Sequence, residues 1–133
     1  MRFAASIALL VFAGAAGAAE QTFLFDVLRL RPYRASWEKL MKAVQPTPDW
    51  LMQFNKNFDG ESGEMIAITI DAKAYQLSFV CKPTECAAHK FEVLFDAGGD
   101  HAYGALGGKD EPPAFYGAPG PAQQQALTKA LAK

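Results

Sequence analysis

The feature that most constrains the fold is a change in the spacing of apolar residues near the middle of the chain. From Met65 onward, apolar and polar side chains alternate, which is the period of a β-strand with one face toward a core. The connections between the alternating runs are short, whereas parallel strands need a crossover of a dozen or more residues. The sequence therefore predicts an antiparallel meander whose strands are MIAITID (65–71), AYQLSFVC (74–81), KFEVLFD (90–96) and the shorter HAYGAL (101–106).

The segments on either side of these strands have a helical pattern. Apolar residues recur three and four positions apart in YRASWEKLMKAV (33–44), between Pro32 and Pro46, so we expect an amphipathic helix there. Apolar stripes on helices would cover the apolar face of the sheet, with Trp37 and Trp50 as core anchors, and an α+β domain follows. The other expected helices are 22–30, 48–54 and the C-terminal segment from Pro121.

The first residues of the chain have the order of a secretory signal peptide. Arg2 precedes an apolar run from Phe3 to Phe12, and small residues continue to Ala19. We expect cleavage after Ala18 or Ala19. No other segment approaches the ~20 apolar residues that span a bilayer, so no membrane association is expected after cleavage. The predicted division is a signal peptide, 1–19, and one domain, 20–133.

Charge excludes some partners of this domain. Without Arg2, the chain has 12 basic and 14 acidic residues and a net charge of −2. It contains no run of Lys and Arg, so nucleic acid and anionic membrane surfaces are not expected partners.

The only two cysteines, Cys81 and Cys86, flank a short polar loop at the tip of the central hairpin. In an oxidising compartment such a pair usually forms a disulfide, and Pro83 would stiffen the same loop. A zinc site formed by both cysteines with His89 and His101 is an alternative. The spacing fits a redox dithiol less well, because that chemistry favours two residues between the cysteines and here there are four.

No motif that pairs a nucleophile with its base is visible in the chain. We therefore predict no catalytic residue, no cofactor and no metal, and we expect that the protein is not an enzyme. A rigid loop that projects from a small sheet suits binding better than catalysis.

Several stretches resemble the Ivy family, the periplasmic inhibitors of vertebrate (c-type) lysozyme from Gram-negative bacteria. The order Cys-Lys-Pro-x-x-Cys between two strands, Cys81 to Cys86, is the most specific part of the resemblance. The other matching stretches are FDVLRLRPYRASWEKLM (25–41), YQLSFVCKPTECAAHKFEVLFD (75–96), AYGAL (102–106) and FYGAPGPAQQQALTKAL (115–131). The resemblance implies an Ivy-like domain over 20–133 and a location in the periplasm.

The resemblance also implies which residues meet the partner. The family's inhibitory loop reads Cys-Lys-Pro-His-Asp-Cys, and its histidine enters the lysozyme cleft to meet the two catalytic carboxylates. In this chain Thr84 stands where that histidine is expected, and Glu85 replaces the aspartate. The expected partner-binding residues are therefore Lys82, Pro83, Thr84 and Glu85, with Lys82 available as a cation.

Three functions follow from these observations. The first is an inhibitor of c-type lysozyme that occludes the glycosidase cleft with the Cys81–Cys86 loop. The second is a paralogue with the same fold that does not block vertebrate lysozyme and binds another periplasmic partner, such as a lytic transglycosylase. The third is an enzyme or zinc protein that uses His89 or His101. A homodimer is compatible with each.

Overall fold

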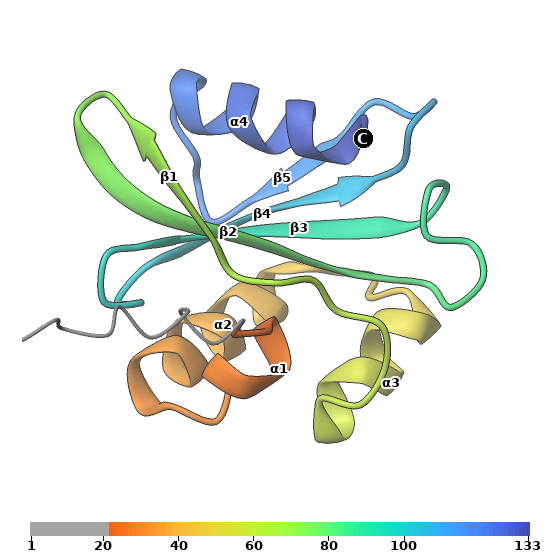
Figure 1. Ribbon diagram of the computed structural model, residues 1–133. Coiled ribbons are helices and arrows are strands. Elements are labelled where there is room, and N and C mark those ends of the chain that lie inside the picture. Colours follow the sequence, from red (N-terminus) through yellow and green to blue (C-terminus); the bar gives the residue numbers. More distant parts are fainter. Residues whose placement is uncertain (1–21) are drawn as a thin grey trace, which may run out of the picture.

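Four helices and five strands make up residues 22–133, the part of the chain that the computed structural model describes (Figure 1). The predicted signal peptide, 1–19, lies outside the described residues. The α+β class is confirmed. The helices are α1 (Leu24–Val27), α2 (Arg31–Ala43), α3 (Asp49–Asn57) and α4 (Pro121–Leu131). The strands are β1 (Ile66–Ile70), β2 (Lys73–Cys81), β3 (Lys90–Asp96), β4 (Ala102–Gly107) and β5 (Ala114–Tyr116).

The five strands form one antiparallel sheet in the order β1-β2-β3-β4-β5, so the predicted meander is confirmed. The fifth strand was not expected. It pairs Phe115 with Ala105 of β4 and ends at Tyr116, directly before Gly117, where φ is +82°. A strand of three residues between prolines and glycines is too short to show an alternating pattern.

Helices cover both faces of the sheet (Figure 1). Helix α4 lies on one face, and α1, α2 and α3 lie on the other. The expectation of one apolar face per strand is therefore wrong for β3, which is buried on both sides. Phe91, Val93 and Phe95 belong to the core under α1 to α3, whereas Leu94 belongs to the core under α4.

The two tryptophans have different environments. Trp37 is fully buried, contacts the rings of Phe54 and Phe91 edge-on, and donates a 2.7 Å hydrogen bond from Nε1 to Oδ1 of Asn55. Trp50 is only half-buried at the edge of the same core. The prediction of a core anchor is thus confirmed for Trp37, whereas Trp50 packs against the core but is only partly buried.

The N-terminal helices differ from their expected bounds. The helix expected at 22–30 is a single turn, α1, and α2 begins earlier than expected, at Arg31. Proline is well tolerated in a first helical turn because the amide it lacks has no partner there, so Pro32 lies inside α2. Within the described part of the chain, no helix is long and apolar enough to cross a membrane.

The meander decides which loops are neighbours. Successive connections in an antiparallel meander alternate between the two ends of the sheet, so the β2–β3 and β4–β5 loops share one end. The β2–β3 loop contains Cys86, follows directly after Cys81 and projects at this end (Figure 1). The β1–β2 and β3–β4 turns lie at the opposite end.

A pair of charges is buried under α4, at the start of β3. Lys90 and Glu92 are both less than 10% exposed, and Nζ of Lys90 lies 3.8 Å from Oε1 of Glu92. The same ammonium group donates to the backbone oxygens of Ala130 (3.5 Å) and Lys133 (3.1 Å) at the end of α4. Burial raises the pKa of Glu92 to about 7, although the positive charge of Lys90 opposes this shift.

This buried carboxyl predicts a pH dependence of stability. The folded chain keeps the Glu92 proton up to about pH 7, whereas the unfolded chain releases it near pH 4.5. The free energy of unfolding should therefore fall as the pH rises between these values. In Glu92→Gln this loss should be absent, so that the variant gains roughly 2–3 kcal/mol relative to wild type between pH 4 and pH 8.

Urea denaturation at several pH values measures this difference, with the exposed Glu64→Gln as control. A constant difference between wild type and Glu92→Gln over the whole range would contradict the prediction.

Candidate partner-binding site

The two cysteines form the predicted disulfide. Cys81, the last residue of β2, is bonded to Cys86 with 4.8 Å between their Cα atoms. Cys81 is buried at 2% exposure, whereas Pro83, Thr84 and Glu85 are exposed. We call residues 81–89 the stapled loop. The first residue of this loop, Cys81, therefore lies in the core, and the tip of the loop faces solvent.

The tip of the stapled loop is a tight turn. The amide of Glu85 donates to the carbonyl of Lys82 at 3.0 Å, Pro83 occupies the second position, and Thr84 the third with φ +67°. This is the pattern of a type II turn, in which the third position favours glycine or asparagine. A β-branched residue with positive φ is a strained outlier, and such strain occurs where the surrounding structure fixes it.

Lys82 is not the free cation that the sequence led us to expect. Its Nζ lies 2.7 Å from Oε2 of Glu85 across the turn. The hydrogen bond and the charge of Lys82 hold the pKa of Glu85 below its ordinary value, with a smaller contribution from His89. Both side chains are over 40% exposed, and such a surface pair is weak enough to exchange partners.

Backbone hydrogen bonds close the base of the stapled loop. The amide of Lys82 donates to the carbonyl of His89 at 2.9 Å, and the amides of Ala88 and His89 donate to the carbonyl of Glu85 at 3.2 and 3.1 Å. Together with the disulfide, these bonds fix the path of the loop from both ends.

The structure does not bring the four proposed zinc ligands together. Both cysteines are in the disulfide, whose sulfurs carry no ionisable proton, so the nearby carboxylate of Glu61, 3.6 Å from Sγ of Cys81, completes no thiolate site. His89 precedes β3 and His101 precedes β4, at opposite ends of the sheet, which separates them by about 20 Å. His101 lies against Tyr103, with Nε2 3.3 Å from the carbonyl of Gly117.

A second loop is bonded to the stapled loop. The amide of Lys109, in the β4–β5 connection, donates to the carbonyl of Ala87 at 2.9 Å. The chains approach so closely here that a methyl group at Gly108 would overlap the carbonyl of Ala88. Glycine is therefore required at this position because of the close approach.

A groove of about 430 Å³ runs beside the stapled loop. It was not visible in the sequence, because its sides come from three distant segments. The meander topology places the β4–β5 connection next to the stapled loop, but no sequence pattern places α3 there. Three segments line the groove. Helix α3 contributes Asp49 and Trp50, and the stapled loop contributes Lys82 and His89. The β4–β5 hairpin contributes Leu106 and Glu111.

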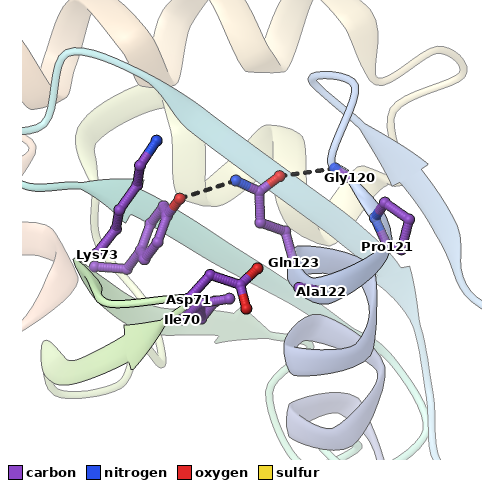
Figure 2. Close-up of a pocket in the computed structure, with 8 residues that line it drawn as sticks. Ile70, Asp71, Lys73, Gly120, Pro121, Ala122 and Gln123 are labelled. Atoms are coloured by element: carbon purple, nitrogen blue, oxygen red, sulfur yellow. Dashed lines mark hydrogen bonds between the residues drawn. The ribbon is translucent and has the colours of Figure 1, made fainter.

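A smaller hollow lies at the opposite end of the sheet, where the N-terminus of α4 meets the β1–β2 turn (Figure 2). Its polar groups bond to one another. The side-chain amide of Gln123 donates to the hydroxyl of Tyr75 at 3.1 Å, and its oxygen accepts from the amide of Gly120 at 2.7 Å. These two hydrogen bonds cap the N-terminus of α4 and connect the helix to β2.

An exposed, ordered loop on a small α+β domain is suited to binding a protein partner. The chain belongs to the Ivy family, described as "Inhibitor of vertebrate lysozyme (Ivy)", which matches residues 32–133. This confirms the family that the stapled loop and its flanking strands indicated. Because the family is one of inhibitors, the expectation that the protein is not an enzyme is also confirmed.

Two related proteins match part of the chain. An inhibitor of vertebrate lysozyme from Pseudomonas aeruginosa is 29% identical over 89 residues, which are 67% of this chain and 56% of that protein. An uncharacterised Yersinia pestis protein is 29% identical over 79 residues, 59% of this chain and 49% of that protein. The chain thus matches about half the length of these relatives.

The contact between the two loops makes a testable prediction. Gly108→Ala should force the carbonyl of Ala88 away and lower the free energy of unfolding by roughly 1–3 kcal/mol, as overpacking does. The adjacent Gly107→Ala is the matched control, since a methyl group there would lie 3.5 Å from Cα of Pro113, an ordinary contact.

Thermal or urea denaturation of both variants measures the effect. If Gly108→Ala is as stable as Gly107→Ala, the two loops are not held together as described.

Proposed function

We propose that this protein is a periplasmic inhibitor of c-type lysozyme and that the stapled loop occludes the glycosidase cleft. The observation that carries the proposal is the Cys81–Cys86 loop, exposed and already ordered, in a chain of the Ivy family. The name of the Pseudomonas aeruginosa relative agrees with this target.

The loop matches the physical demands of such an inhibitor. A retaining glycosidase presents two carboxyl groups about 5 Å apart in a cleft. A flexible loop loses conformational entropy when it enters a cleft, and a loop ordered beforehand avoids most of that loss. In this protein the disulfide, the turn at Pro83 and the backbone bonds at the base supply the order before binding.

The exposed tip offers a cation to the catalytic acids. Thr84 has one neutral hydroxyl, which is too short to bridge two carboxylates. The ammonium group of Lys82 has three donors and is held only by the exposed Glu85. We infer that Lys82 turns from Glu85 to the lysozyme carboxylates on binding.

The threonine weakens this inhibitor relative to one with histidine at the same position. A charge-assisted hydrogen bond contributes about 1.5–3 kcal/mol, which is about 10- to 150-fold in affinity. Histidine is also enriched among non-glycine residues with positive φ, the conformation of Thr84. Thr84→His therefore suits the backbone as well as the proposed target.

Secretion belongs to the same proposal. The order of basic, apolar and small residues in 1–19 supports export through a signal peptide. In the periplasm the protein would meet a lysozyme that has crossed the outer membrane, and the oxidising conditions there favour the disulfide.

The departure at Thr84 favours one alternative target. A loop without the expected histidine suits a paralogue that binds another muramidase, such as a lytic transglycosylase of the cell itself. The stapled loop would be used in the same way, and only the cleft would differ.

Inhibition of cell-wall lysis by a c-type lysozyme tests the proposal. Thr84→His should strengthen inhibition by about one to two orders of magnitude. Lys82→Ala should weaken it by about tenfold or more, because the cation is lost. Thr69→His, on the exposed surface of β1, is the matched control and should have no effect.

If neither wild type nor Thr84→His slows lysozyme at micromolar concentration, the lysozyme proposal is wrong. Inhibition of a lytic transglycosylase by the same preparation would then establish the alternative.

A further inference from the structure

We propose that the groove beside the stapled loop receives an arginine side chain of the muramidase whose cleft the loop occupies. The inference rests on the proposed function and extends it from one loop to a second contact. It adds α3 and the β4–β5 connection to the binding surface.

Two carboxylates without ionic partners line the groove. Asp49 is exposed in the first turn of α3, and Glu111 is exposed in the β4–β5 connection. Neither takes part in a salt bridge within residues 22–133. Carboxylates on separate elements that line one groove suit a guanidinium group, whose fork of five N–H donors binds carboxylates with defined geometry.

An aromatic side chain forms part of the same groove. Trp50 is half-buried, and its indole N–H has no acceptor among the described residues. Trp37 differs in both respects, being fully buried and hydrogen-bonded to Asn55. Guanidinium groups pack favourably against indole rings, and partly exposed tryptophans are common at the centre of protein interfaces.

The balance of charge around the groove favours a cation. Lys82 also lines it, but its charge is compensated by Glu85 at 2.7 Å in the free protein and by the lysozyme carboxylates in the proposed complex. Asp49 and Glu111 remain uncompensated, so the groove is negative, as is the chain as a whole at −1. A cationic lysozyme is complementary to this surface, and such complementarity fixes the register of a complex.

The groove is also held in a fixed position relative to the stapled loop. The hydrogen bond from Lys109 to Ala87 connects the segment that carries Glu111 to the loop. The bond from Lys82 to His89 closes the loop base beside the groove. A partner with a cleft for the loop and an arginine at the matching distance would meet both sites without rearrangement.

The test compares two double variants with the same change in net charge. Asp49→Asn with Glu111→Gln neutralises the groove. Asp71→Asn with Asp100→Asn neutralises exposed acids in the β1–β2 and β3–β4 turns, at the opposite end of the sheet. The dissociation constant for a c-type lysozyme is measured by calorimetry in physiological salt. We expect the groove variant to bind at least tenfold more weakly than the control variant, which should remain within about twofold of wild type.

The outcomes separate this inference from the proposed function. If wild type binds lysozyme and the two double variants bind equally, the groove inference is overturned and the stapled-loop proposal stands. If wild type does not bind lysozyme at all, both are overturned. Should the double groove variant fail to fold, the single variant Glu111→Gln, in an exposed loop, is compared with Asp100→Asn as its control.

Discussion

The structure depends above all on the antiparallel pairing of β2 with β3. The register runs from Tyr75 opposite Asp96 to Cys81 opposite Lys90, and it brings the two ends of the stapled loop together. A bridge across so short a loop contributes only about 2 kcal/mol through chain entropy. The disulfide therefore adds more to the shape of the loop than to the stability of the domain.

Packing on both faces keeps this hairpin in place. Phe91 contacts Trp37 on the side of α1 to α3. On the other side, the ammonium group of Lys90 bonds to backbone oxygens at the end of α4. The first two residues of β3 are thus fixed from opposite faces directly below the stapled loop. The rigidity of this end of the sheet follows from the core rather than from the loop alone.

Much of this fold was predictable because alternation and helical period are local properties. Four strands, the long helix and the disulfide were expected, whereas β5 was too short to produce a pattern. The site was only partly predictable. The exposure of the loop follows from its place in a hairpin, but the Lys82–Glu85 pair and the positive φ of Thr84 depend on three-dimensional geometry. The groove combines residues from three elements, and no pattern of spacing connects Trp50 with Glu111.

The central claim is that one end of the sheet, formed by the stapled loop and the β4–β5 connection, is the binding surface for a muramidase. Amide chemical shifts of the ¹⁵N-labelled protein, recorded while a c-type lysozyme is added, test this most directly. The account predicts shifts or broadening at residues 82, 84–89 and 108–111 and unchanged signals at the β1–β2 and β3–β4 turns. Changes centred on those two turns, with the stapled loop unaffected, would contradict it.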